Sequence, residues 1–424
     1  MALQGDVQQA ILSLQANERQ KNTEEANMTP LPKGVVALGL VSLFMDFSSE
    51  MIHSLLPVFL VTVLGASALS VGFIEGIAEA TASIAKVFSG VISDWLGRRK
   101  PLVLLGYGLA ALTKPLFPLA TGIGEVFTAR FLDRIGKGIR GAPRDALIAD
   151  ITPAANRGAA YGLRQSMDTV GAFGGPLLAM ALMAATHDNF RLVFWVAVIP
   201  AFVCVLIIVF GVEEPEHTRP AAHTRMPISR ENLRRLSARF WWVVAFAAVL
   251  TLARFSEAFL LLRAENVGLA VTWVPMILIV MNVVYAASAY PFGKLSDNGS
   301  RRKLLFWGIL LLIAADLILA LSSNFWLVGL GAAVWGLHMG ATQGLLSALI
   351  ADTAPADLRG TAFGVFNLAS GGALLAASVI AGGLWTVAGP AMTFYAGAAF
   401  SFVALAGLLI GGRKHAHMRQ RSGS

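Results

Sequence analysis

The chain has 424 residues, of which 56% are hydrophobic and only 14% charged, and its formal net charge is +8. Soluble globular domains carry about 25% charged residues, so this composition excludes a soluble two-domain enzyme and indicates a membrane protein. The positive charge does not require nucleic acid as a partner, because Lys and Arg cluster in short loops between apolar segments.

Apolar segments set the predicted organisation of the chain. After a polar N-terminal tail, 1–33, they predict twelve transmembrane helices at 34–64, 70–95, 101–120, 124–150, 159–186, 190–212, 240–262, 270–294, 302–322, 325–350, 361–386 and 390–412. A polar linker, 213–239, divides them six and six, and 413–424 forms a C-terminal tail. The predicted fold is an all-α membrane protein of two pseudo-symmetric six-helix bundles, 34–212 and 240–412, around a central cavity.

The basic loops predict the orientation in the bilayer. Clusters at 98–100, 301–303 and 213–239 occupy alternate loops, which is the positive-inside bias of membrane proteins. We therefore expect a multi-pass protein of a bacterial inner membrane, with both tails and the linker in the cytoplasm. The single cysteine, Cys204, provides neither a disulfide framework nor a thiolate metal cage.

The first two predicted helices carry acids on one face. At ~100° per residue, Asp46, Glu50 and His53 lie within about 60° of one another, and Glu75 and Glu79 are ~40° apart. The proton affinity of an acid in a low-dielectric cavity responds to water, substrate and nearby Arg. We expect Asp46 or Glu50 to carry a proton, with His53, Glu75 and Glu79 lining the cavity.

The fourth predicted helix is highly charged. Within sixteen positions it contains Arg130, Asp133, Arg134, Lys137, Arg140, Arg144 and Asp145. Lipid cannot solvate such groups, so those at membrane depth must face a wet cavity or pair within the bundle. We expect Arg134 and Lys137 to point inward, and Arg134 to modulate the proton carrier.

The remaining polar residues at membrane depth are few. Asp168 on the fifth helix, Glu257 on the seventh and His338 on the tenth are candidate cavity residues. Lys114 and Asp316 occupy equivalent positions of the third and ninth helices, which should lie outside the bundle, and snorkelling accounts for Lys114 better than for Asp316.

Two other interpretations of the polar stripe stay open. Its residues could simply hydrogen-bond neighbouring helices, or Asp46, Glu50 and His53 could ligate a divalent cation with Glu75, Glu79 or His338. Nearby Arg and Lys would repel a bare cation, so we predict no metal site and no cofactor.

The two halves repeat in sequence. GVISDWLGRRK at 90–100 matches GKLSDNGSRRK at 293–303, and LIADITPAANRGAAYG at 147–162 matches LIADTAPADLRGTAFG at 349–364. The offsets, 203 and 202 residues, are nearly equal, which indicates an internal duplication. Internally repeated transporters place the substrate near the bilayer midplane and rock one half against the other.

These motifs resemble the major facilitator superfamily, over essentially all of 34–412. Its glycine–acid–glycine–basic signature is matched by Gly90, Asp94, Gly97, Arg98 and Arg99, and its repeat by Gly293, Asp297, Arg301 and Arg302. Gly171, Gly175 and Pro176 resemble a fifth-helix motif of the 12-helix drug/proton antiporter branch, where small residues let helices approach and proline can bend them. The resemblance implies alternating access, with Asp–Arg pairs in the signature loops latching a gate.

The sequence therefore predicts a secondary active transporter, acting as a monomer on a small-molecule substrate and protons. The leading hypothesis is a proton-coupled efflux antiporter for a small amphiphilic or anionic organic compound. The alternatives are a proton symporter importing an anionic nutrient or metal chelate and, less favoured, a divalent-metal exporter. No enzyme is expected, because the chain lacks H-E-x-x-H and G-x-S-x-G motifs and its loops are short.

Overall fold

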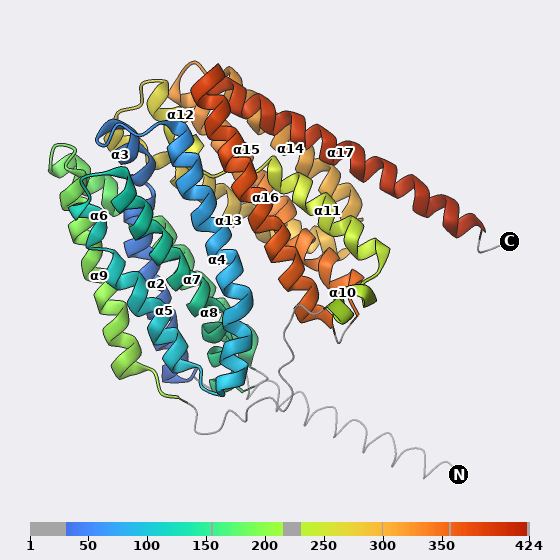
Figure 1. Cartoon of the computed structure of the whole chain (residues 1–424), viewed down its shortest axis with the longest axis horizontal. Helices are drawn as coiled ribbons and strands as arrows, with labels where there is room; N and C mark the ends of the chain where they lie inside the picture. Colours follow the sequence, from blue (N-terminus) through green and yellow to red (C-terminus); the bar gives the residue numbers. More distant parts are fainter. Residues whose placement is uncertain (1–30, 154–155, 215–229, 299, 356–357, 422–424) are drawn as a thin grey trace, which may run out of the picture.

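The structure, a computed structural model, describes residues 31–153, 156–214, 230–298, 300–355 and 358–421. The described residues are helical almost throughout (Figure 1). The helices are α2 (Lys33–His53), α3 (Leu56–Thr62), α4 (Ala68–Leu96), α5 (Lys100–Thr113), α6 (Leu116–Leu119), α7 (Ile123–Ile151), α8 (Arg157–Ala185), α9 (Phe190–Gly211), α10 (Arg230–Arg235), α11 (Ala238–Leu252), α12 (Ala258–Asn266), η2 (Val271–Trp273), α13 (Met276–Asn298), α14 (Arg301–Leu321), α15 (Phe325–Thr353), α16 (Arg359–Ala388) and α17 (Pro390–Arg421).

Short polar residues fix several helix starts. The side chains of Ser67, Asn189, Ser237, Ser300 and Asn324 each accept a hydrogen bond from the backbone N–H three residues on. Such caps satisfy donors that a helix leaves unpaired at its N-terminus. Ser300 stands in the repeated motif 293–303 at the position that Gly97 occupies in 90–100. Its cap starts α14, so this serine has a local role of its own.

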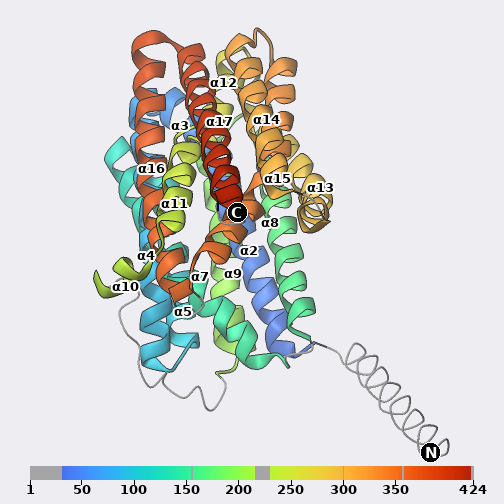
Figure 2. The same cartoon turned by 90° about the vertical axis from the view of Figure 1, so that its right-hand side faces the viewer.

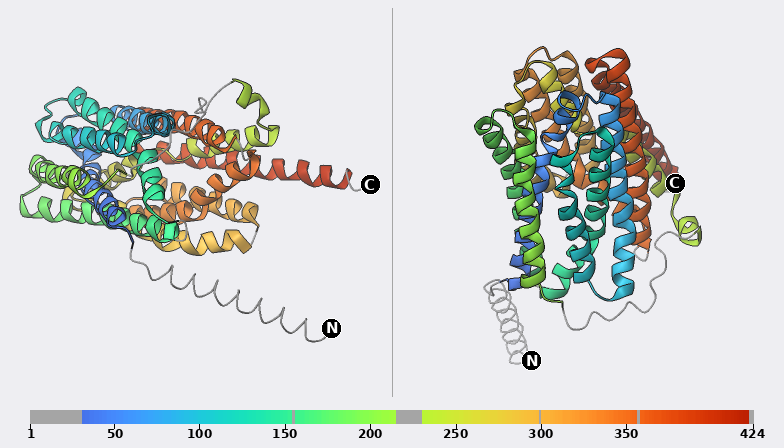
Figure 3. Two further views of the ribbon diagram at one scale, coloured as in Figure 1. Left: turned by 90° about the horizontal axis from the view of Figure 1, so that it is seen from below. Right: turned by 60° about the vertical axis from the view of Figure 1, so that its left-hand side comes forward.

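The helices form two groups. Most of the helices α2 to α9 pack on one another, as do most of α11 to α17, while α4 and α16 pack chiefly on each other across the two groups (Figures 1 and 2). We call the end of the molecule that carries Arg98 and Arg301 the basic end, and the end that carries loops 63–67 and 267–270 the far end. The view from below in Figure 3 shows the two groups side by side.

The predicted helices are present, and four of them are interrupted, the eighth at 274–275 between η2 and α13. The first is broken at 54–55 between α2 and α3, the third at 114–115 between α5 and α6, and the seventh at 253–257 between α11 and α12. The breaks at 54–55 and 256–257 are related by the duplication offset of 202 residues. The interruption is thus a repeated feature of the first helix of each half.

Length and apolarity identify ten of the described helical segments as able to cross a membrane. Helix α7 has the length, at 29 residues, but is highly charged, and α11 has only 15 residues. Twelve crossings therefore stay a prediction. Helix α17 runs to Arg421, beyond the predicted end at 412, through a segment rich in Arg, Lys, His, Met and Gln, several of which favour helices.

The two halves meet most closely where α4 crosses α16. A Cβ placed on Gly72 would lie 2.1 Å from the Ser378 carbonyl oxygen, and one on Gly382 would lie 2.5 Å from that of Ala68. Toward the far end the Leu69 N–H donates to Thr386 Oγ1 at 3.3 Å. Glycines therefore let the halves pack backbone against backbone on the far-end side.

Ion pairs at the basic end repeat the duplication. Arg99 pairs with Asp150 through Nε and Oδ2 at 3.4 Å, and Arg301 pairs with Asp352. The residue numbers of the two pairs differ by the duplication offset, because adding 202 to 99 and 150 gives 301 and 352. Each pair ties the loop after one helix to the end of another within its own half.

Candidate functional site

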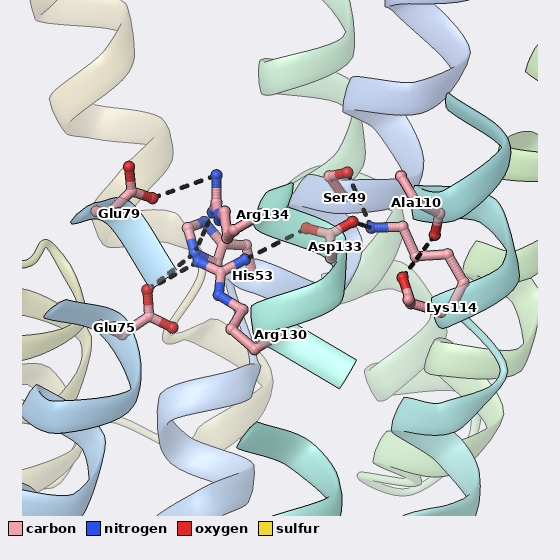
Figure 4. Close-up of polar contacts among 10 residues, drawn as sticks. Ser49, His53, Glu75, Glu79, Ala110, Lys114, Arg130, Asp133 and Arg134 are labelled. Carbon is pink, nitrogen blue, oxygen red and sulfur yellow. Dashed lines mark hydrogen bonds and ion pairs between the residues drawn. The ribbon is translucent and has the colours of Figure 1, made fainter. Parts of the chain in front are cut away.

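A buried charged cluster joins α2, α4 and α7 (Figure 4). Arg130 Nη2 donates to Glu75 Oε2 at 2.8 Å, and Arg134 Nη1 lies 3.2 Å from Glu79 Oε1. Arg130, Arg134 and Glu75 are each less than 5% exposed. Buried charges are tolerated when paired in this way, so four of the predicted membrane-depth charges neutralise one another.

His53 lies between the two pairs, at the break that ends α2. Its Nε2 is 3.3 Å from Glu75 Oε2 and 3.0 Å from Arg134 Nη2. One ring nitrogen cannot donate to the carboxylate and accept from the guanidinium together, because each role needs the other tautomer. His53 can therefore donate to Glu75 when Nε2 carries the ring proton, and accept from Arg134 when it does not.

Lys114 is buried, and the snorkelling prediction is wrong. Its Nζ donates to Asp133 Oδ1 and to Ser49 Oγ, each at 3.0 Å, and the residue is 1% exposed (Figure 4). The break between α5 and α6 begins at Lys114, whose side chain contacts α2 and α7 inside the half. Lys114 does not need to reach the membrane surface, because Asp133 provides a counter-ion inside the half.

Asp46 and Glu50 differ from the paired acids. Neither forms an ion pair within the described part of the chain, and both side chains are partly exposed. Both interact electrostatically with Lys137 of α7, an exposed residue that likewise has no ion pair among the described residues. The structure thus brings together two free acids and a free ammonium group on α2 and α7.

Arg134, expected to modulate these acids, contacts Glu79 and His53 directly. Its effect on Glu50 is electrostatic and at longer range. Asp168, another candidate, pairs with Arg164 of its own helix, with Nη2 2.9 Å from Oδ2, and interacts with Asp46.

Two glycines of α8 set the spacing of α2. A Cβ placed on Gly171 would lie 2.7 Å from the Leu43 carbonyl oxygen, and one on Gly175 would lie 2.8 Å from that of Phe47. The same atoms would meet Asp46 Cβ and Glu50 Cβ at 3.0 and 2.9 Å. This small-residue spacing holds the two acids against α8, and Pro176 stands inside the same helix.

The other half contributes residues from the break in its first helix. Arg254 and Glu257 lie between α11 and α12, and both are partly exposed. Glu257 interacts electrostatically with Glu50, Glu79 and Lys137 of the first half. The break in the second half therefore places Glu257 near charged groups of α2, α4 and α7 in the first half.

His338 lies apart from the first cluster, which contradicts its suggested role in a shared metal shell. It is fully buried on α15, and both ring nitrogens are bonded within the second half, to Arg254 and to the Gly308 carbonyl. Among the described residues, His53, Glu75 and Glu79 form a possible metal-ligand group, with ligand atoms within 4.8 Å. Arg130 and Arg134 already bind these acids and oppose a bare cation.

Asp316 is enclosed on α14. It is 0% exposed, and neither carboxylate oxygen has a hydrogen-bond partner in the described part of the protein. A Cβ on Gly397 would lie 2.7 Å from Oδ2, and Phe255 is also close to that glycine. Its duplication partner, Lys114, has a counter-ion, whereas Asp316 does not.

The signature loops are described in part. Gly97 ends α4 at φ 63°, the left-handed conformation that favours glycine, Gly90 approaches Ala142, and Arg98 is exposed. Arg99 Nη1 donates to Ser93 Oγ at 2.7 Å, and Arg302 Nη2 donates to the Leu408 carbonyl at 3.0 Å. The side chains of Asp94 and Asp297, and the surroundings of Gly293, lie outside the described residues.

Comparison with known proteins identifies the family. The model of the Major Facilitator Superfamily matches residues 38–281 and 257–424. The chain belongs to this superfamily. It is 33% identical over 403 residues to an uncharacterised MFS-type transporter of Methanocaldococcus jannaschii, covering 92% of this chain and 97% of that one.

Two further similarities fit this membership. Multidrug resistance protein MdtG of Proteus mirabilis is 28% identical over 280 residues, covering 65% of this chain and 66% of the relative. A crystal structure of a POT family transporter in complex with a thioalcohol-conjugated peptide superposes with a TM-score of 0.74 at 14% identity, covering 89% and 95% of the chains. The protein is thus a multi-pass membrane protein with the fold of a secondary transporter.

Sequence reasoning missed Arg254 and left Arg130 and Asp133 without partners. Arg254 lies with Glu257 in a mostly apolar segment, which was a signal in itself, since an intramembrane Arg marks a functional site by default. Arg130 and Asp133 approach each other at 4.0 Å along α7, which their spacing suggests. Their closer partners, Glu75 and Lys114, come from other helices and could not be found from spacing.

Proposed function

We propose that the protein is a proton-coupled antiporter that exports a small amphiphilic or anionic organic compound across a bacterial inner membrane. One observation carries the proposal. Asp46 and Glu50 remain without an ion pair in the described part of the chain, while Glu75 and Glu79 beside them are bound to Arg. An acid held by Arg keeps its charge, whereas a free acid at a partly exposed site can take up and release a proton.

The proposed movement follows from the contacts between the halves, 34–212 and 240–412. Close glycine contacts of α4 with α16 and hydrogen bonds near Leu69 and Asp188 join them toward the far end. With the basic end in the cytoplasm, as the positive-inside rule suggests, the structure corresponds to a state closed toward the outside. Export then requires these contacts to separate while contacts form at the basic end.

The duplicated pairs at the basic end suit this cycle. Arg99–Asp150 and Arg301–Asp352 hold each half together near the loops that would meet on closure. Partly exposed ion pairs contribute only about 1 kcal/mol or less, so they can exchange partners. A transporter needs two states separated by only a few kcal/mol.

Glu50, Lys137 and Glu257 would couple the movement of protons to the movement of the substrate. These groups interact across the two halves, so protonation of an acid changes the charge that the substrate and the opposite half meet. The name of the relative MdtG favours efflux. The same residues could serve a symporter, so the test must report direction.

The test begins with a thermal-shift screen of the purified protein against drugs, siderophores, organic acids and metals. A stabilising compound is then followed in reconstituted vesicles with a pH-sensitive dye. We expect substrate addition to release protons in exchange, and Asp46→Asn or Glu50→Gln to abolish coupling while Glu231→Gln, an exposed acid of α10, leaves it intact. Transport that survives collapse of the pH gradient would overturn antiport, and proton movement in the direction of the substrate would indicate a symporter.

A further inference from the structure

Arg254 is held by one edge of its guanidinium group. Its Nε donates to His338 Nε2 at 2.8 Å, and its Nη2 donates to Thr342 Oγ1. Both partners belong to α15, where His338 and Thr342 are fully buried. The bonds orient the group from behind and leave its outer edge free of these contacts.

The hydrogen bonds also fix the state of His338. A guanidinium nitrogen can only donate, so Nε2 accepts, and the ring proton must lie on Nδ1, which donates to the Gly308 carbonyl at 2.6 Å. The imidazole that supports Arg254 is therefore neutral. It positions the cation without cancelling its charge.

No carboxylate of the described residues compensates Arg254. It forms no ion pair with any acid in the described part of the chain, in contrast to Arg130 and Arg134. Of five N–H donors, one goes to His338 and one to Thr342, so three remain. Arg254 is partly exposed, and its Nη1 is not among the buried atoms that lack a partner, so the free edge is open.

Arg254, which carries this free edge, lies at the break in the first helix of the second half. Arg254 follows the C-terminal end of α11, whose carbonyls favour a cation. Interrupted helices at corresponding positions of two repeats are where repeated transporters bind substrate, and the matching break at 54–55 lies beside His53. Arg254 thus lies at the second half's counterpart of the charged cluster in the first.

We infer that the free edge of Arg254 is the binding point for a carboxylate group of the transported compound. That the ligand is the transported compound rests on the proposed function, whereas the binding of a carboxylate to Arg254 does not. Two parallel N–H groups of one guanidinium match the two oxygens of a carboxylate. A dianion such as phosphate fits less well, because one cation serves the site and Glu257 lies three residues away.

The experiment measures the chemical accessibility of each arginine in the wild-type full-length protein. Purified protein in detergent is treated with phenylglyoxal, which condenses with free guanidinium nitrogens, and each labelled peptide is quantified by mass spectrometry. Arg254 is expected to label at least tenfold faster than Arg130, whose guanidinium is bonded to Glu75. Exposed Arg98 serves as the freely reactive reference.

Benzoate, benzamide and inorganic phosphate are then added as probes. Benzoate at five times its half-protecting concentration is expected to slow labelling of Arg254 about sixfold and to leave Arg98 unchanged, whereas the uncharged benzamide protects neither. Phosphate is expected to protect more weakly than benzoate.

Each contrary result overturns the inference. An unreactive Arg254 means that its edge is closed, equal protection by benzoate and benzamide means that the anion is not recognised, and stronger protection by phosphate identifies a different anion. These readings need no transport, so they stand or fall separately from proton exchange in vesicles. As an independent check, Arg254→Gln should weaken stabilisation of the protein by benzoate at least fivefold, with Arg254→Lys intermediate.

Discussion

Asp133 and Asp316 provide a matched test of how charge is stabilised inside this protein. Both are acids buried among helices, at 4% and 0% exposure, but among the described residues only Asp133 has ion-pair partners, Lys114 at 3.0 Å and Arg130 at 4.0 Å. Asp133→Asn keeps the shape and removes the charge, which leaves the Lys114 ammonium group buried with Ser49 as its remaining close partner. Breaking a buried pair on one side costs about 3–5 kcal/mol.

Asp316→Asn should behave differently. Neither oxygen of Asp316 accepts a hydrogen bond from the described residues, so a neutral amide gives up no stabilising contact. We expect its effect on the free energy of unfolding to stay within about 1 kcal/mol. The difference between the two identical substitutions, roughly 2–5 kcal/mol, is the predicted quantity.

The assay is unfolding of the purified variants by increasing SDS in a mild detergent, followed by circular dichroism. The double variant Lys114→Met/Asp133→Leu removes both charges and should recover at least half of the loss, because an apolar pair can replace a buried ion pair. The reasoning is refuted when Asp133→Asn is as stable as wild type, or when Asp316→Asn loses as much as Asp133→Asn.

Three further predictions follow from other contacts. Gly175→Ala brings a Cβ within 2.8 Å of the Phe47 carbonyl oxygen and should lower the free energy of unfolding in the same assay by about 1–3 kcal/mol. The control Gly162→Ala has open space around it and should not change stability. Equal effects of the two variants would show that the α2–α8 contact is unimportant. Glu214 accepts hydrogen bonds from the backbone N–H groups of Arg99 and Lys100 at 2.6 and 2.7 Å, so Glu214→Ala should lower the free energy of unfolding by about 0.5–2 kcal/mol. Glu213→Ala serves as the control, and equal stability of the two variants would contradict a capping role for Glu214. Leu69 N and Thr386 Oγ1 lie 3.3 Å apart across the halves, so in a Cys204→Ala background Leu69→Cys with Thr386→Cys should cross-link on oxidation and stop transport until reduced. Transport by the cross-linked protein would contradict opening at the far end.

The fold was largely predictable, because apolar length and the duplicated motifs are local signals. The predicted segments lie in helices, and the family is confirmed by the match to residues 38–281 and 257–424. The interruption at 54–55 has a local signal that the sequence analysis did not use, because Pro57 stands in the first turn of α3 and cannot donate to a preceding turn. The interruption at 253–257 could not be predicted in this way, since it contains neither Gly nor Pro.

The candidate site was predictable in composition but not in pairing. The wheel placed Asp46, Glu50 and His53 on one face, and the structure leaves the two acids unpaired in the described part while His53 meets Glu75 and Arg134. Which acid meets which cation depends on the relative height of α4 and α7, which a helical wheel does not contain. For the same reason Lys114 was wrongly expected to snorkel.

The most direct test of the account asks whether Lys137 and Glu257 border water between the halves. In the Cys204→Ala background, Lys137→Cys, Glu257→Cys and Ile199→Cys are treated with a charged, membrane-impermeant thiol reagent in open membranes. Ile199 is a 63% exposed apolar residue in the middle of α9. Thiolate formation needs water, so the first two cysteines should react at least tenfold faster than the third. Slow reaction at Lys137→Cys and Glu257→Cys, with Ile199→Cys equal or faster, would contradict a wet, charged interface between the halves.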